Sequence, residues 1–291
     1  MGPFADATLQ GLAQGSMIAL IALGYTMVYG VLGLINFAHG EVFMAGAFAG
    51  QIALVRFGGG LPPPLAFAAA VACAFAASLA VGLSVERLAY RPLLERPPGP
   101  GPRPSPLVTA LAMSVLLQNV AVVALGTRPR GYPRLALPTQ PLIVAAALAA
   151  MLALHLVLAR TWLGKALRAV AADPEAARLV GMRTARVVAF AFALGSALAA
   201  LGAVLYCLDQ SQAYPTMGAA VGTRAFVAAV LGGIGSVPGA VLGGLLLGLV
   251  GEWSKLTDYA GGQDALGFAV LVVVLLVRPT GLLGRRREEK V

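Results

Sequence analysis

The chain is 291 residues long, and 59% of these residues are hydrophobic while only 11% are charged. A water-soluble domain has about 25% charged residues, so this composition excludes a soluble globular protein and predicts a surface that faces lipid. The formal net charge is +9. The basic residues cluster in a few loops and in the tail, which is typical of charges that orient a protein in a membrane, so we expect no nucleic-acid partner.

Apolar stretches of membrane-spanning length follow one another along the chain. About 20 helical residues cross roughly 30 Å of hydrocarbon, and the alternating pattern of an outer-membrane barrel is missing. We predict eight membrane-embedded helical segments, at residues 10–33, 37–56, 65–88, 106–126, 141–159, 185–207, 223–250 and 264–278. The first is too long for a signal-peptide core and has no basic residues before it, so we expect it to be retained. The prediction is an all-α polytopic membrane protein with one transmembrane domain, residues 1–291.

Three connections carry most of the positive charge, and the positive-inside rule assigns them to the cytoplasm. Their basic residues are Arg87, Arg91, Arg96 and Arg103, then Arg160, Lys165, Arg168, Arg178, Arg183 and Arg186, and finally Arg278, Arg285, Arg286, Arg287 and Lys290. The loop with Arg128, Arg130 and Arg134 is an exception on the outer side. This assignment places the N-terminus outside and the C-terminus in the cytoplasm. Eight simple crossings would leave the C-terminal tail outside, so at least one segment does not cross as a simple helix.

Two of the apolar segments contain residues that oppose a continuous helix. In the seventh, Gly232 to Gly239 combines flexible glycines with a proline that lacks an N–H, and we predict a broken or re-entrant element there. The second segment opens with a comparable interruption from Asn36 to Glu41. Non-helical backbone at membrane depth is tolerated only where protein or a watery cavity covers it, so both breaks are predicted to face inward.

Polar and helix-breaking residues within apolar sequence are candidates for a transport path, because polar groups are costly in hydrocarbon. These candidates are Asn36, His39, Glu41, Gln118, Asn119, Gly233, Gly235, Ser236 and Pro238. Structural roles stay open: Asn36 can satisfy free backbone groups, Glu41 can lie at a helix N-terminus, and Gln118 with Asn119 can hydrogen-bond between helices. On a helix, His39 and Glu41 would point about 200° apart, and only an extended break would let them meet.

The loop at residues 161–186 is too polar to span a membrane and too apolar to be a solvated linker. Asp173 is predicted to cap a helix, Pro174 fits its first position, and Glu175 complements the positive end of its dipole. Gly181 is predicted to end this helix at the C′ position. The result is a stub of about seven residues, roughly 10 Å long. Its predicted apolar face consists of Ala176, Ala177, Leu179 and Val180.

Two interpretations of this stub fit the residue pattern equally. In the first, the apolar face docks into a groove on a partner protein. In the second, the helix lies on lipid headgroups while Arg168, Arg178 and Arg183 extend toward the polar layer. Because both kinds of helix share an amphipathic pattern, the pattern alone leaves the choice open.

The stub also resembles a known signature. Glu175-Ala176-Ala177 followed by Gly181 is similar to the EAA–x3–G signature of ABC importer permeases, whose coupling helix fits a cleft on the ATPase subunit. The downstream I-x-L-P element of that family is missing, since Ala191-Phe192 stand at the expected distance. Residues 34–41, 230–239 and 278–284 resemble the H-type permease of branched-chain amino acid ABC transporters. This resemblance extends from about Leu9 to Gly284.

The resemblance implies a multi-subunit importer of the bacterial inner membrane. Its other parts would be a paralogous M-type permease, two cytoplasmic ATPase subunits, an extracytoplasmic binding protein and the surrounding lipid. The substrate would be leucine, isoleucine, valine or a related amino acid, and ATP would be used by the partner subunits. The residues implied to couple this chain to the ATPase are Asp173, Pro174, Glu175, Ala176, Ala177, Arg178, Leu179 and Gly181.

Enzymatic functions find no support in the sequence. Gly164-Lys165 lacks the first glycine of a nucleotide-binding loop, and the histidines stand outside any HExxH pattern. Cys73 and Cys207 lie singly, without the spacing of a metal site. We therefore expect no catalysis, no metal and no bound cofactor. Two alternatives to an ABC permease stay open, namely a secondary transporter driven by an ion gradient and a membrane scaffold without transport.

Overall fold

The computed structural model describes residues 2–95, 106–257 and 260–284, and it consists of long apolar helices. Seven helices have the length and composition to cross a membrane: α1 (Pro3–Leu32), α2 (His39–Phe57), α3 (Pro63–Val85), α5 (Pro106–Leu125), α6 (Thr139–Arg160), α9 (Thr184–Gln210) and α11 (Val237–Ser254). Two shorter apolar helices are α10 (Met217–Gly232) and α12 (Gln263–Val277). The predicted class, an all-α polytopic membrane protein, is confirmed.

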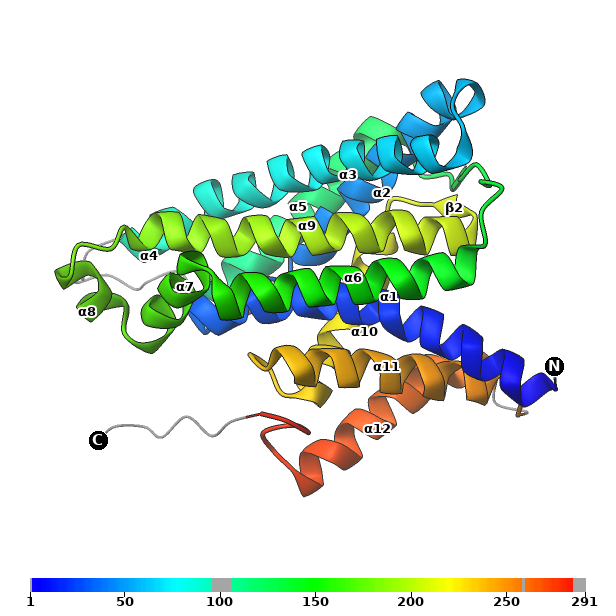
Figure 1. Ribbon diagram of the computed structural model, residues 1–291. Coiled ribbons are helices and arrows are strands. Elements are labelled where there is room, and N and C mark those ends of the chain that lie inside the picture. Colours follow the sequence, from blue (N-terminus) through cyan, green and yellow to red (C-terminus); the bar gives the residue numbers. More distant parts are fainter. Residues whose placement is uncertain (1, 96–105, 258–259, 285–291) are drawn as a thin grey trace.

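Short elements lie at the two ends of the bundle. They are η1 (Gly58–Gly60), the π-helix η2 (Glu86–Tyr90), α4 (Arg91–Glu95), α7 (Trp162–Ala172), α8 (Pro174–Leu179), η3 (Ala260–Gly262), and the strands β1 (Arg130–Gly131) and β2 (Gln212–Ala213). The strands pair antiparallel, with Arg130 opposite Ala213. Figure 1 shows α4, α7 and α8 at one end, here the α8 end, and β2 with the start of α1 at the opposite, N-terminal end.

The predicted seventh segment, residues 223–250, is two helices rather than one. α10 ends at Gly232 and α11 begins at Val237, so the predicted break is confirmed. Two glycines between them have positive φ, +103° at Gly233 and +91° at Gly235, and side chains rarely adopt such a backbone. The described residues therefore contain nine apolar helices, seven of membrane-spanning length and two shorter, where eight segments were predicted.

The break before α2 lies earlier in the sequence than predicted. The non-helical connection covers residues 33–38, whereas His39, Gly40 and Glu41 form the first turn of α2. A carboxylate in a first turn is favoured by the helix dipole, which explains why Glu41 begins a helix instead of interrupting one. The His39 side chain lies against Gly24, eight residues before the end of α1 and about 12 Å along its axis. The connection therefore folds back into the bundle.

The core of the bundle forms around α1, which packs along α11 and α9. Gly11 and Gly15 of α1 face Gly248 and Gly244 of α11 so closely that an added Cβ would meet the opposite backbone. Small residues allow this approach, which is the usual way helices pack in lipid. α5 and α12 lie at the periphery, and most of their large apolar side chains are exposed. The peripheral surfaces therefore face lipid or a partner.

The basic loop that departs from the positive-inside pattern has local contacts. Arg130 Nη2 donates to the Leu125 carbonyl at 2.7 Å, where a cation complements the C-terminal end of α5. Arg134 Nε donates to Ser211 Oγ at 3.4 Å. The adjacent Tyr132 is buried, and burial raises the pKa of its phenol. Among the basic residues predicted to be cytoplasmic, Arg96, Arg103, Arg285, Arg286, Arg287 and Lys290 lie outside the described residues.

Candidate functional site

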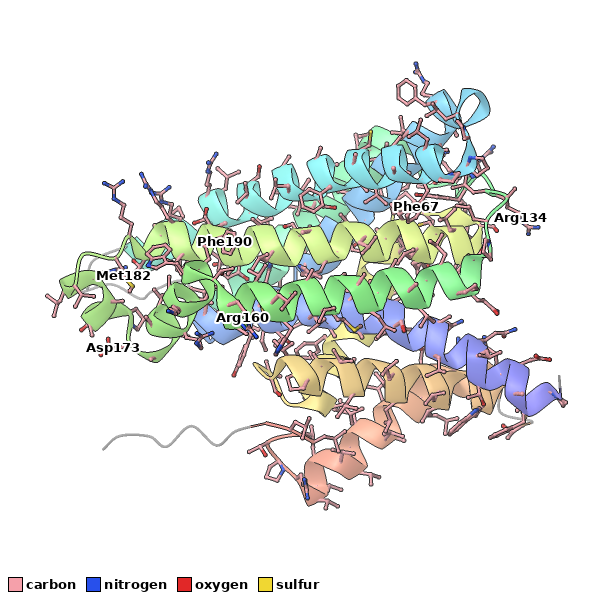
Figure 2. The ribbon with its side chains drawn as sticks, viewed as in Figure 1. Phe67, Arg134, Arg160, Asp173, Met182 and Phe190 are labelled. Atoms are coloured by element: carbon pink, nitrogen blue, oxygen red, sulfur yellow. The ribbon has the colours of Figure 1, made fainter. Side chains whose placement is uncertain are left out.

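Asp173 separates α7 from α8 and caps α8 as predicted. Its Oδ1 accepts hydrogen bonds from the backbone N–H groups of Glu175 and Ala176, both at 2.9 Å. Pro174 occupies the first helical position, where its missing N–H leaves no bond unmade. Figure 2 shows Asp173 at the α8 end of the bundle, far from Arg134 at the opposite end. The start of the stub is thus fixed by local chemistry.

The stub ends at Gly181, also as predicted. α8 has six residues, and Gly181 follows its C-cap Val180 with φ +83°. The N–H of Met182 donates to the Ala177 carbonyl at 3.0 Å, and that of Gly181 to the Arg178 carbonyl at 3.0 Å. These two bonds make a Schellman motif, in which the left-handed residue is usually glycine.

The apolar face of the stub differs from the predicted one. Leu179 is 88% exposed and Val180 is 74% exposed, whereas Ala177 is only 5% exposed and packs into the bundle. Ala176, Leu179 and Val180 stand at i, i+3 and i+4, so they share one face, while Ala177 lies about 100° around the helix. We call Ala176, Leu179 and Val180 the stub face. It is an unusually apolar surface to present at a loop.

Side-chain contacts attach α8 and the preceding α7 to two long helices. Arg178 Nε donates to Thr184 Oγ1, in the first residue of α9, at 3.0 Å. On the other side, Thr161 caps α7 by accepting from the Gly164 N–H at 3.2 Å, and Arg168 Nη1 donates to the Leu158 carbonyl of α6 at 2.5 Å. A cavity of about 720 Å³ lies between α8 and the ends of α1 and α9. The stub is therefore linked to α9 directly and to α6 through α7, with a cavity on the side that faces α1 and α9.

His39 is buried in a notch between α1 and α9. Its imidazole packs against Gly24, where an added Cβ would clash with the ring, and lies within contact distance of Gly195. It also makes an edge-to-face contact with Tyr25 at 4.8 Å between centroids. Nε2 has no hydrogen-bond partner among the described residues. The notch exists because Gly24 leaves room for the ring, while Gly195 lets α9 approach the backbone of α1 closely at this level.

Glu41 points away from His39, into the junction of α2, α5 and α10. Ser114 Oγ donates to Glu41 Oε1 at 3.4 Å, while Oε2 has no partner in the described part of the chain. The carboxylate lies against Gly218, in the first turn of α10. It thus faces the positive ends of two helix dipoles, that of α2 and that of α10. The structure does not bring His39 and Glu41 together.

The other polar path candidates have local partners. The Tyr90 hydroxyl lies 3.1 Å from the Ile35 carbonyl and 3.4 Å from Asn36 Oδ1, so buried Asn36 belongs to a network that supports the break before α2. Asn119 Nδ2 donates to the Val115 carbonyl of its own helix at 2.8 Å. The bond between helices that we expected for Asn119 is therefore not formed within the described residues. Gln118 is half-buried.

Gly233, Gly235, Ser236 and Pro238 form the turn between α10 and α11. Ser236 Oγ accepts from the Gly239 N–H at 3.2 Å and caps α11, with Pro238 in its first turn. The segment after α12 closes over this turn, since the N–H groups of Leu282 and Leu283 donate to the carbonyls of Leu231 and Gly232 at 2.9 Å each. The turn lies 14 residues along α10 from Gly218, about 21 Å, so the path candidates form two separate groups.

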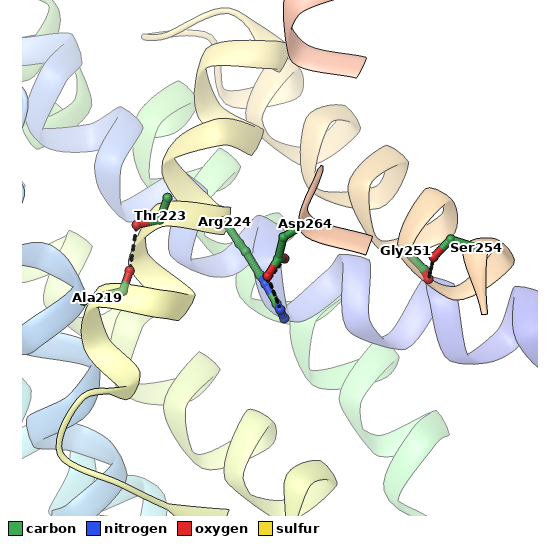
Figure 3. A network of polar contacts seen from close by, with 6 residues as sticks. All are labelled: Ala219, Thr223, Arg224, Gly251, Ser254 and Asp264. Carbon is green, nitrogen blue, oxygen red and sulfur yellow. Dashed lines mark hydrogen bonds and ion pairs between the residues drawn. The ribbon is translucent and has the colours of Figure 1, made fainter. Parts of the chain in front are cut away.

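One charged pair was missed by the sequence analysis. Arg224, in the middle of α10, makes a bidentate ion pair with Asp264 at the start of α12, with distances of 2.6 and 2.9 Å (Figure 3). A single cation inside an otherwise apolar stretch of α10 is the signal that could have identified it. Its partner lies 40 residues away and gives no local signal.

The chain is similar to known permease proteins over nearly its full length. The family described as branched-chain amino acid transport system, permease component, matches residues 7–277. The chain is 42% identical to the high-affinity branched-chain amino acid transport system permease protein BraD of Pseudomonas aeruginosa, over 97% of this chain and 96% of that protein. It is 40% identical to LivH of Escherichia coli K12, a permease protein of the same description, over 99% and 98%. The ribose import permease protein RbsC of Escherichia coli K12 is 25% identical over 91% and 83%.

Proposed function

Because the chain belongs to the family of branched-chain amino acid transport permease components, we propose that it imports leucine, isoleucine, valine or related amino acids. The observation that carries this proposal is the match to BraD and LivH over nearly the full length of all three chains. The chain is a transport subunit rather than a catalytic one. We assign ATP hydrolysis to two separate cytoplasmic subunits, and we infer a paralogous M-type permease and an extracytoplasmic binding protein as the other partners.

The distribution of charge supports an orientation for the chain. Arg160, Lys165, Arg168, Arg183 and Arg186 all belong to α7, α8 or their flanks, so the positive-inside rule assigns the α8 end to the cytoplasm. If all nine apolar helices cross the membrane, we infer that the chain termini lie on opposite sides, with the N-terminus outside. The conflict between charge and an even number of crossings is removed once residues 223–250 count as two helices.

The stub face is the proposed contact with the ATPase. Ala176, Leu179 and Val180 are apolar, exposed and held by caps at both ends, which suits insertion into a groove on a protein. We propose that residues Asp173 to Gly181 move with that groove during the ATP cycle. The Arg178–Thr184 bond and the Arg168–Leu158 bond then transmit the movement to α9 and α6.

The proposed path runs beside the buried junction of α2, α5 and α10. Glu41 lies at this junction, with Ser114 and Gln118 following one another on α5 at helical spacing. Asn36 precedes α2, Asn119 lies next to Gln118 on α5, and His39 lies behind the junction, in the notch between α1 and α9. Gly233, Gly235, Ser236 and Pro238 form the turn at the cytoplasmic end. In this proposal the permease gates the path, and the binding protein supplies most of the recognition of free substrate.

Uptake by the reconstituted transporter tests this proposal. The chain, the M-type permease and both ATPase subunits are assembled in proteoliposomes with ATP at the ATPase side, and uptake of radiolabelled leucine is measured with binding protein added. We expect uptake that needs both ATP and binding protein. Uptake by the purified chain alone with an ion gradient would indicate a secondary transporter instead. Partner binding without any substrate uptake would indicate a scaffold. Uptake of ribose but not of leucine would indicate that the substrate is a sugar, as the name of RbsC states for that protein.

The path residues are tested separately from the substrate. Single substitutions Asn36→Ala, His39→Ala and Glu41→Gln are expected to lower leucine uptake while the complex still assembles. Uptake at the wild-type rate in all three variants would restrict these residues to a structural role. Val272→Ala, at an exposed apolar position of α12, serves as the control and should leave uptake unchanged.

A further inference from the structure

A cavity of about 270 Å³ lies between α1, α10, α11 and α12, in the half of the bundle nearer the N-terminal end. Its polar edge includes Arg224, Asp264 and Gln14, and its walls include Ile18, Leu247 and Phe268. The contact of Trp253 with Phe4, whose rings stack at 5.5 Å, fixes the C-terminal end of α11 beside the start of α1. The cavity therefore lies far from α8, on the side where the proposed binding protein would release substrate.

The ion pair at the edge of the cavity is accessible. The side chains of Arg224 and Asp264 are 33% and 59% exposed, and Figure 3 shows them pointing toward one another from α10 and α12. Exposed ion pairs contribute little to stability, so each partner can exchange the other for an equivalent charge. Within the described residues, the Gln14 side chain makes no hydrogen bond, and the Thr223 hydroxyl donates only to its own helix at Ala219. Both groups are available to a ligand.

We propose that this cavity binds the zwitterion of a free aliphatic α-amino acid. Arg224 donates two hydrogen bonds to the carboxylate of the ligand, and Asp264 accepts hydrogen bonds from its ammonium group. The aliphatic side chain of the ligand packs against Ile18, Leu247 and Phe268. Guanidinium and carboxylate have matching planar geometry, which makes arginine the suitable partner for that group. The proposal rests on the proposed function and deepens it, because it assigns a substrate site on this chain in addition to the one on the binding protein.

Without a ligand, Arg224 and Asp264 pair with each other, and this pairing makes the site selective. A zwitterion replaces both halves of the pair with an equivalent interaction. A carboxylic acid without an ammonium group, or an amine without a carboxylate, would break the pair and replace only one of its two charged contacts, so it should bind more weakly than the zwitterion. The cavity of about 270 Å³ lies near the lower end of the roughly 300–1,000 Å³ typical of small-molecule pockets, which suits a ligand as small as an amino acid.

Direct binding to the full-length chain tests the proposal. The chain is placed in nanodiscs of phosphatidylglycerol, and saturation-transfer NMR is recorded with L-leucine, 4-methylpentanoate and 3-methylbutylamine. We expect a signal for leucine and little for either analogue. Arg224→Gln and Asp264→Asn should each weaken leucine binding about tenfold, the effect of losing one charge-assisted contact. Arg134→Gln is the matched control, since this exposed arginine lies in the outer loop and makes one long hydrogen bond, and it should bind leucine normally.

A charge exchange separates binding from folding. The double variant Arg224→Asp/Asp264→Arg should fold with an unchanged thermal melt and keep an ion pair, but it should lose affinity for leucine, because the charges then face the wrong groups of the ligand. Recovery of both stability and binding, or normal binding in both single variants, would overturn the proposal. So would a leucine signal that disappears when phosphatidylethanolamine, whose headgroup carries similar charges, is added to the nanodiscs.

Failure of the site and failure of the proposed function can be told apart. If the complete transporter imports leucine while Arg224→Gln and Asp264→Asn bind and transport it normally, the site is refuted and the function stands. If the complete transporter imports no amino acid, the proposed function fails first, whatever the nanodisc experiment shows.

Discussion

Replacement of Gly181 tests the coupling role of the stub with the least ambiguity. Its φ of +83° lies in the left-handed region, where an ordinary side chain costs about 1–2 kcal/mol. A Cβ at this position would meet nothing within 4 Å, so the cost comes from the backbone and not from crowding. Gly181→Ala therefore strains the Schellman motif, whereas Gly181→Asn is tolerated because asparagine adopts this conformation more readily.

The strain at position 181 sets the size of the effect on coupling, because it can be relieved by opening the two backbone hydrogen bonds that end α8. If strain of 1–2 kcal/mol is relieved by opening them, the population of correctly ended stub falls by about 5- to 30-fold relative to the open form. The assay is the number of leucine molecules transported per ATP hydrolysed by the reconstituted complex. We expect Gly181→Ala to lower this ratio and Gly181→Asn to stay near the original value.

The two substitutions also separate backbone strain from contact with a partner. Asparagine is larger than alanine, so a cleft that excludes any side chain would impair Gly181→Asn more than Gly181→Ala. That order, or equal and undiminished coupling in both variants, would refute the argument from φ. Unchanged amounts of assembled complex are required for either conclusion, and these are measured by co-purification of the ATPase subunits.

Three further predictions use the caps and the helix packing. Asp173→Ala removes two hydrogen bonds at 2.9 Å and should destabilise α8 by about 1 kcal/mol, lowering ATPase co-purification, whereas Asp173→Ser should retain it. Gly15→Val would force a side chain into the backbone of α11 and should lower the unfolding temperature markedly in a thermal melt. Gly30→Val, in the same helix but with open space around it, should not. Ser236→Ala uncaps α11 and should speed amide exchange at the α10–α11 turn by about fivefold, corresponding to about 1 kcal/mol.

The stub could be predicted almost completely because its chemistry is local. Asp173, Pro174 and Gly181 each act within four residues of their own position, so the spacing in the sequence already contains the cap geometry. The direction of Ala177 was wrong for a different reason. A stub of six residues has one face against its own protein, and only the contact with the bundle decides which face that is.

The interior of the bundle could be predicted only in part, because its contacts join distant helices. The sequence marks the break between α10 and α11 through its glycines, but it does not reveal that α2 begins at His39 beside Gly24 and Gly195. Nor does it pair Arg224 with Asp264, since a spacing of 40 residues carries no periodic signal. Composition predicts that a helix is embedded, whereas its neighbours are determined by side-chain volumes that come together only in the fold.

One continuous helix connects the proposed coupling surface to the buried candidates of the path. α9 begins at Thr184, which bonds to Arg178 of the stub, and reaches Gly195 eleven residues later, about 16 Å along the axis. At that level Gly195 and Gly24 enclose His39, whose own helix carries Glu41 to the start of α10. A tilt of α9 driven from the stub would therefore change the width of the notch first. Because the imidazole already fills the space beside Gly24, a narrower notch would press on the ring, and α2 with Glu41 would move relative to α10.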